Sequence, residues 1–143
     1  LERKLISNLQ NNHTGLDCLA RIAVREGEEQ HADCLAECAR KEVETFKMWE
    51  YAAYVVPLEV AISRKDTQSS LSILKVMLEA LVVPWNMKES PIYKHIGQKE
   101  SEVNFGKQVL PSILSELENS SEYEFLRSVP KFQQLLESYR AKC

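Results

Sequence analysis

The stretch from Glu42 to Leu81 decides the fold, and it reads EVETFKMWEYAAYVVPLEVAISRKDTQSSLSILKVMLEAL. Two apolar segments, 51–62 and 71–83, flank one polar turn at 64–67. In the second segment leucines recur at the spacing of a single helix face, at Leu71, Leu74, Leu78 and Leu81. The first segment has the same period. We therefore expect two antiparallel helices that meet through their apolar faces and start the hydrophobic core.

Two residues mark helix ends within this hairpin. Asp66 precedes the second apolar segment, where its carboxylate can accept hydrogen bonds from free backbone N–H groups of the next turn, so it is the expected N-cap. Pro57 lies in the first arm, where proline removes one backbone donor and clashes with the preceding turn. We expect a kink or break near Val55 and Val56, with a new helical start at Pro57.

Composition limits the class of protein. The 143 residues suit one domain with a sizeable core, and the 4 glycines together with the absence of long β-branched runs favour an all-α fold. The net charge of -3 comes from interspersed acids and bases, so no basic stripe predicts direct nucleic-acid binding by this segment. No apolar run is long enough to span a bilayer and no signal peptide is visible, which predicts a cytoplasmic protein without membrane contact.

The N-terminal part predicts three further helices. A short amphipathic helix over 1–10 is expected to end at a break over 11–13, and a second helix to run from Thr14 to Gly27. Gly27 suits the left-handed conformation that follows a helix end. A third helix is expected from Glu28 to near Lys41. The expected buried positions are Leu16, Leu19, Ala20, Ala23 and Val24 in the second helix and Ala32, Leu35, Ala36 and Ala39 in the third.

The C-terminal part, 84–143, predicts a cap of helical pieces on the hairpins of 1–83. An irregular segment at 84–87 and a short turn over 90–96 precede a long helix over 100–118. Ser121 and Glu124 have the spacing of a capping box. Pro130 opens the last helix, whose inward residues are expected to be Phe132, Leu135, Leu136 and Tyr139.

The order helix, turn, helix occurs twice, over 14–41 and 43–83. Antiparallel pairs joined by short turns stack into α-solenoids, because a single pair cannot bury both of its faces. Within the first pair, LDCLARIAVREGEEQHADCLAECARKE resembles a tetratricopeptide repeat, with small or apolar packing residues at Leu16, Leu19, Ala20, Gly27 and Ala32. The expected architecture is a short tetratricopeptide-like α-solenoid of stacked antiparallel hairpins.

Three later runs, YVVPLEVAISRKDTQSSLSILKVMLEAL, SPIYKHI and SEYEFLRSVPKFQQLL, carry a second resemblance. They are similar to the C-terminal region of bacterial transcriptional regulators that begin with a xenobiotic-response-element-type helix-turn-helix. The resemblance covers residues 14–140, most clearly 54–136, and implies a regulatory domain that senses an effector, dimerises or binds a partner and that lacks its DNA-binding domain in this chain. It implies a homodimer as the working form. The alternative is a stand-alone helical adaptor that binds a peptide or protein partner.

Five residues are candidates for contact with a peptide or small-molecule effector: Arg21, Arg25, Trp49, Tyr51 and Tyr54. On a helix, Trp49 and Tyr51 cannot share a face, so at least one ring is expected to point away from the core and toward a ligand. The alternative for the aromatic residues is core packing. Arg21 and Arg25 could bind a peptide carboxylate in the same groove, or be ordinary solvated charges.

The cysteines raise the question of a metal or redox site. His31, Cys34 and Cys38 share one side of the third helix, and Cys18 could supply a fourth zinc ligand. We favour the alternative, reduced thiols packed between helices, over zinc binding or redox sensing. Glu28 and His31 form only half of a di-iron motif. No phosphate loop, nucleophile elbow or acid–base pair is evident, so we expect neither a cofactor nor an enzyme.

Overall fold

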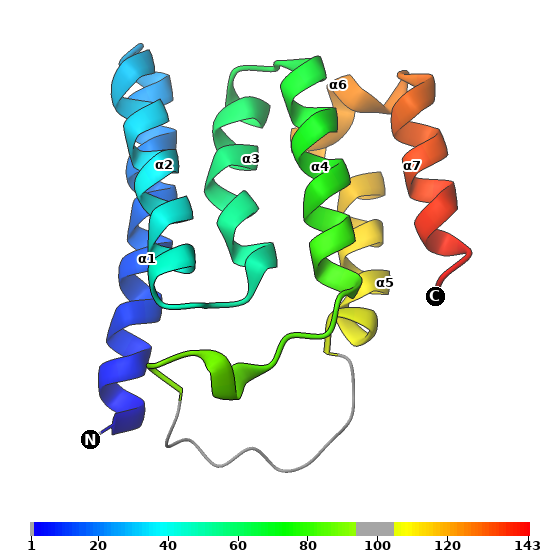
Figure 1. The fold of residues 1–143 in the computed structure, drawn as a ribbon. Coiled ribbons are helices and arrows are strands. Elements are labelled where there is room, and N and C mark those ends of the chain that lie inside the picture. Colours follow the sequence, from blue (N-terminus) through cyan, green and yellow to red (C-terminus); the bar gives the residue numbers. More distant parts are fainter. Residues whose placement is uncertain (1, 94–104) are drawn as a thin grey trace.

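The computed structural model describes residues 2–93 and 105–143, and every regular element within them is helical (Figure 1). The α-helices are α1 (Glu2–Arg25), α2 (Glu29–Thr45), α3 (Val55–Ser63), α4 (Thr67–Val82), α5 (Phe105–Asn119), α6 (Glu124–Arg127) and α7 (Pro130–Arg140). Three 3-10 helices are η1 (Glu50–Tyr54), η2 (Met87–Glu89) and η3 (Ser121–Tyr123). The prediction of an all-α fold is confirmed.

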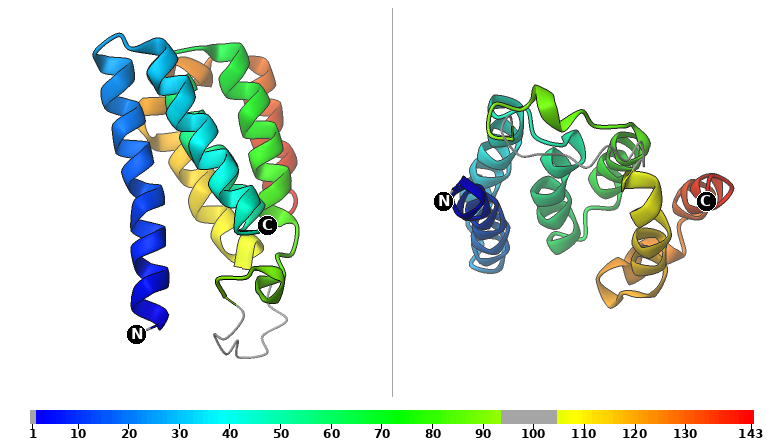
Figure 2. Two further views of the ribbon diagram at one scale, coloured as in Figure 1. Left: turned by 60° about the vertical axis from the view of Figure 1, so that its left-hand side comes forward. Right: turned by 90° about the horizontal axis from the view of Figure 1, so that it is seen from below.

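The helices follow one another side by side along the molecule. α1 packs against α2 and α3, α3 against α4, α4 against α5, and α5 against α7. The view from below shows this succession from the N-terminal pair to α7 (Figure 2). α1 and α7 therefore lie at opposite ends of the row, and each has one face that no other described helix covers.

The hairpin of α3 and α4 forms as its sequence predicts. Asp66 is the N-cap of α4, and its Oδ1 accepts a hydrogen bond from the Ser69 backbone N–H at 3.1 Å. Lys65, just before the cap, has a φ of 53°, which reverses the chain between the two helices. The α4 leucines Leu74, Leu78 and Leu81 are 0% exposed. They belong to the larger of two core clusters, which also holds side chains of α3, α5, α6 and α7.

The expected break in the first arm is also present. The backbone changes from the 3-10 helix η1 to α3 between Tyr54 and Val55. Pro57 is thus the third residue of α3, in the first turn, where backbone N–H groups have no partner inside the helix. Proline costs little there. The helix starts two residues before the proline, not at it.

The break expected over 11–13 is wrong, because α1 runs without interruption from Glu2 to Arg25. Consequently Thr14 does not open a separate helix. Asparagine and histidine are only mildly unfavourable inside a helix, and tertiary contacts override such preferences. Here His13 supplies the contacts: its Nδ1 lies 2.8 Å from Glu42 Oε2 of α2, and its Nε2 lies 3.3 Å from the Ala52 carbonyl oxygen of η1.

Small residues hold α1, α2 and α3 together in the second core cluster. Its buried members are Ala20, Ala23, Ala32, Leu35, Ala39, Val56 and Val60. The expected end of α1 before Gly27 is confirmed, with a glycine φ of 76°. α2 runs on to Thr45, beyond the expected end near Lys41. Leu19, expected in the core, is 51% exposed, because α1 turns its alanine face inward.

The C-terminal part follows the prediction in outline. Residues 83–86 are irregular, Pro130 is the first residue of α7, and Phe132, Leu136 and Tyr139 are buried as expected. The capping box is wrong, since Ser121 lies in η3 and α6 begins without a side-chain cap. The end of the turn expected over 90–96 and the start of the helix expected from Glu100 lie outside the described residues.

Candidate functional site

A groove with a volume of about 460 Å³ lies between α1, α3 and the η3–α6 segment. Seen from below, these three parts lie on the same side of the row of helices (Figure 2). The groove is lined by Arg21, Glu59, Ile62, Ser63, Lys65, Ser121, Glu122, Glu124 and Phe125. A smaller cavity of about 170 Å³ lies between α3, α4, α5 and η3, and its lining includes Tyr51, Glu116 and Tyr123. Glu59 lines both hollows, so it stands where they meet.

One arginine, Arg21, forms ion pairs with three carboxylates at this groove. Arg21 Nη2 lies 3.1 Å from Glu59 Oε2, Nε lies 3.4 Å from Asp17 Oδ2, and Nη1 lies 3.8 Å from Glu122 Oε1. The arginine side chain is 46% exposed, whereas that of Glu59 is 15% exposed. A half-exposed cation therefore pairs with a carboxylate whose side chain is largely withdrawn from water.

The charges in the groove shift each other's pKa. Burial raises the pKa of Glu59 to about 7; Arg21 opposes this shift, and the carboxylates of Asp17, Glu122 and Glu116 add to it. Burial alone would lower the pKa of Arg21, but the neighbouring carboxylates of Glu59, Asp17 and Glu122 raise it overall. Burial also raises the pKa of Tyr123, with Glu59 contributing.

Negative charge exceeds positive charge in the groove. Among the described residues that line it, the acids are Glu59, Glu122 and Glu124 and the bases are Arg21 and Lys65, and Asp17 adjoins the groove through its ion pair with Arg21. Asp17 Oδ1 is buried and accepts no hydrogen bond from the described part of the chain. A buried carboxylate oxygen without a donor is costly. The groove is thus suited to receive an additional positively charged or hydrogen-bond-donating group.

The five candidate residues from the sequence do not form one site. Arg21 lines the groove, and Tyr51 lines the adjoining cavity. The Arg25 side chain is 74% exposed, its Nε lies 3.8 Å from Glu26 Oε1, and it borders neither hollow.

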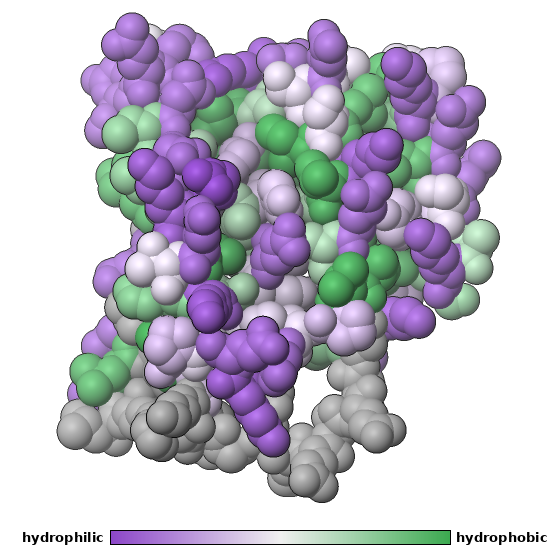
Figure 3. All heavy atoms as spheres, viewed as in Figure 1, coloured by the Kyte–Doolittle hydropathy of each residue, from purple (hydrophilic) through white to green (hydrophobic). Residues whose placement is uncertain are grey.

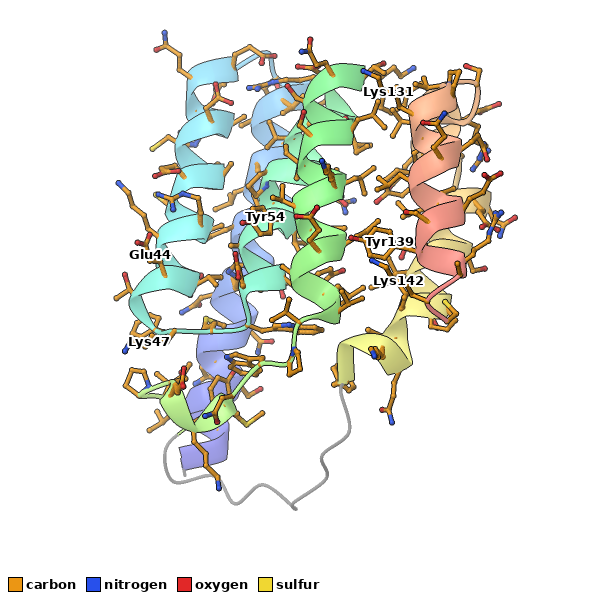
Figure 4. The ribbon with its side chains drawn as sticks, turned by 45° about the vertical axis from the view of Figure 1, so that its right-hand side comes forward. Glu44, Lys47, Tyr54, Lys131, Tyr139 and Lys142 are labelled. Carbon is orange, nitrogen blue, oxygen red and sulfur yellow. The ribbon has the colours of Figure 1, made fainter. Side chains whose placement is uncertain are left out.

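Tyr54 lines a separate hollow of about 300 Å³ together with Arg40, Glu44 and Lys47, and its hydroxyl donates to Glu50 Oε1 at 3.3 Å. Figure 4 shows Glu44, Lys47 and Tyr54 together, apart from Tyr139 of α7 and from Lys142, which follows that helix.

The expectation that Trp49 and Tyr51 cannot share a face is wrong. Their ring centroids lie 4.9 Å apart, and Phe105 stands edge-on to Trp49 at 5.8 Å. Helical spacing does not apply, because Trp49 is in extended conformation before η1, with a ψ of 120°. Both rings are partly buried against the larger core cluster. Both rings therefore pack against the core, which is the alternative interpretation given for them from the sequence.

The prediction that the thiols pack between helices is wrong. Cys18, Cys34, Cys38 and Cys143 are all free and exposed. α1 and α2 meet through alanines, which leaves the cysteines on the outer sides of both helices. Within residues 2–93 and 105–143, no group of three or more histidine, cysteine or acidic residues has a metal-binding arrangement. The zinc interpretation of His31, Cys34, Cys38 and Cys18 finds no support in the described residues.

Sequence reasoning missed the central residue of the groove. Glu59 is the one acidic residue in the run VVPLEVAI at 55–62, and a lone carboxylate in an apolar helix was the available signal. Nothing in the sequence predicted that Asp17, Arg21 and Glu122 would gather around it, since they come from two other elements.

No family model, curated protein or solved structure matches this chain. The groove is therefore interpreted from its own residues. Within the described segments, no helix has the length and apolar character needed to cross a bilayer.

Proposed function

We propose that this chain is a partner-binding helical domain of tetratricopeptide-like architecture. Alternating helices, α1, α3 and α5 with its following turn, contribute most of the lining of the two hollows, whereas α2 contributes none of it and α4 contributes only Met77. In α-solenoids such a surface, formed by one helix of each pair, is where extended partners bind. The occupant of this groove would be a peptide segment that carries a lysine or arginine side chain.

The observation that carries this proposal is the environment of Glu59. Its side chain is 15% exposed, and its carboxylate pairs with Arg21, which also pairs with Asp17 and Glu122. A cation from a partner would pair with Glu59, and it would allow Arg21 to turn outward. The apolar side chains of Ile62 and Phe125 border the same groove and suit an apolar residue beside the cation.

The resemblance to xenobiotic-response-element-type regulators extends this proposal to a biological role. In that role the domain is the regulatory half of a transcriptional regulator, works as a homodimer, and neither binds DNA directly nor catalyses a reaction. Binding in the groove would change the spacing of two DNA-binding domains only as far as the partner prefers one arrangement over the other. Sequencing the coding DNA before Leu1 tests this role: an in-frame helix-turn-helix supports it, and a start codon just before Leu1 contradicts it.

Binding of basic peptides tests the groove. Fluorescence anisotropy should show that peptides with a central arginine or lysine beside an apolar residue bind more tightly than matched peptides with norleucine. Glu59→Gln should weaken binding about tenfold, which corresponds to the loss of one partly buried ion pair. Glu44→Gln, in the separate hollow beside Tyr54, is the matched control and should leave affinity unchanged. Equal binding of basic and norleucine peptides would refute the proposed partner.

A further inference from the structure

The outer face of α1 carries a stripe of side chains that no described helix covers. The stripe consists of Leu5, Asn8, Asn12, Gly15, Leu19 and Ile22. Its large apolar members are unusually open to solvent, with Leu5 55%, Leu19 51% and Ile22 46% exposed. A Cβ added at Gly15 would meet no atom within 4 Å. The stripe is therefore an open surface with a gap at its centre where another helix backbone could approach closely.

The spacing of the stripe is that of a helix–helix seam. The steps between its members alternate between three and four residues, which is the 3.5-residue repeat of positions a and d in a coiled coil. A helix that packs only against the core of its own chain usually has a broader apolar face than the narrow seam of a coiled coil. α1 already has such a face on its other side, where Ala20 and Ala23 are buried against α2 and α3. The outer stripe is thus a second face of α1, apolar at its two ends and polar or small at its centre.

The charge distribution on α1 separates this face from ordinary solvated helix surface. Between Lys4 and Arg21, none of the described exposed residues of α1 is charged. By contrast, the exposed side of α2 carries Glu29, Asp33, Glu37, Arg40, Lys41 and Glu44. Figure 3 shows hydrophilic side chains over the outer turns of α2. Depletion of charge is what distinguishes the centre of an interface from the rest of a protein surface.

We propose that this stripe binds α1 of a second copy of the chain, with the two helices antiparallel. Continuing the seam by four residues from Ile22 reaches Glu26, which is 62% exposed, and the exposed Lys4 adjoins Leu5 at the other end. A parallel pair would place the two Glu26 carboxylates against each other. An antiparallel pair brings each Lys4 near the partner's Glu26, a closed two-fold arrangement that uses both ends.

The antiparallel register also matches the side chains along the seam. With the two-fold axis between Asn12 and Gly15, each Leu5 meets the partner's Ile22. Each Asn12 then lies opposite the partner's Gly15, where the missing side chain makes room. A polar residue such as asparagine within a seam fixes register at some cost in affinity. This interface would form the homodimer of the proposed regulator role, so in that respect it rests on the proposed function. It does not involve the groove, because Arg21 projects from another side of α1.

Light scattering over a concentration series tests the interface directly. Wild-type chain should reach twice its monomer mass of 16.4 kDa. Leu19→Lys should raise the dissociation constant at least about tenfold, because each copy then places a charge in the seam. Val76→Lys adds the same charge at a comparably exposed apolar site on α4, 40% exposed, and should leave the dimer intact. Circular dichroism establishes that each variant is folded.

Charge exchange tests the antiparallel orientation. Lys4→Glu and Glu26→Lys should each weaken the dimer a few-fold, and the double variant should restore it. A Glu26→Gln variant that dimerises more tightly than wild type would indicate parallel helices and overturn the proposed arrangement, because it removes the repulsion between two facing Glu26 carboxylates. A wild-type chain that stays monomeric at its highest soluble concentration, or a Leu19→Lys chain that stays dimeric, would refute the interface. Glu59→Gln should leave the dimer unchanged, so failure of the groove and failure of the interface are distinguishable.

Discussion

Arg21 Nη2 of α1 lies 3.1 Å from Glu59 Oε2 of α3, and this ion pair joins the first helical pair to the second at the floor of the groove. The two partners differ in their access to water, since the arginine side chain is 46% exposed and the glutamate 15%. The pair therefore does not fully compensate for the burial of the carboxylate, and the pKa of Glu59 rises to about 7.

Glu59 should make stability depend on pH. Its folded-state pKa of about 7 lies above the ordinary 4.5, so the folded chain holds this proton more tightly than the unfolded chain. The resulting stabilisation is fully present below about pH 4.5 and is lost as the pH rises through 7, by at most about 3 kcal/mol. Glu59→Gln should therefore be more stable than wild type at pH 8 and similar to it near pH 4.5. Urea unfolding at both values measures this difference.

The matched control for this pH effect is Glu124→Gln, an isosteric change at an exposed residue of the same groove. It should not reproduce the gain at pH 8. If Glu59→Gln destabilises the protein equally at both pH values, the Arg21 pair outweighs burial and our account of Glu59 is wrong.

Trp49 should contribute to folding and not only to binding. Its ring packs on Tyr51 and Phe105 beside the larger core cluster, so Trp49→Ala should lower the free energy of unfolding by about 2 kcal/mol. Trp49→Phe should lower it less, because Trp49 Nε1 is buried without an acceptor among the described residues. Tyr54→Ala, at the separate hollow, should cost less than Trp49→Ala. If Trp49→Ala leaves the free energy of unfolding unchanged but abolishes peptide binding, Trp49 contributes to binding and not to folding.

Asp66 should stabilise the start of α4 through its carboxylate. Hydrogen bonding from the Ser69 backbone lowers the pKa of Asp66, so the charged form is the better cap. Asp66→Ala should lower the midpoint of urea unfolding at pH 7, and Asp66→Asn should retain most of the stability, because asparagine also caps helices well. Equal losses in both variants would show that the cap is not the source of the stability.

Ala39 should tolerate no larger side chain. It is 0% exposed in the cluster that joins α1, α2 and α3, where helices approach through small residues. Ala39→Leu should lower the free energy of unfolding by about 1–3 kcal/mol through overpacking. Cys38→Leu, one position earlier and exposed, is the control and should change it little. Thermal unfolding followed by circular dichroism compares the two variants.

Local patterns were enough to predict several elements of this protein. The leucine spacing of α4, the Asp66 cap, the end of α1 before Gly27 and the proline at the start of α7 depend on nearest neighbours along the chain. Such interactions are short in sequence, so they can be recognised from residue type and spacing. The interrupted N-terminal helix was wrong because His13 is held by Glu42 and Ala52, which are distant in sequence.

The sequence by itself determined an all-helical chain with a central hairpin, because helical period, caps and breakers act within a few residues. Only the tertiary structure decided which faces are buried. It turned the alanines of α1 inward and left Leu19 outside, and it placed Trp49 and Tyr51 ring against ring. It also gathered Asp17, Glu59 and Glu122 around Arg21, from three elements, in one group of ion pairs. The physical reason is that burial and charge pairing depend on distances in space, which packing between helices sets.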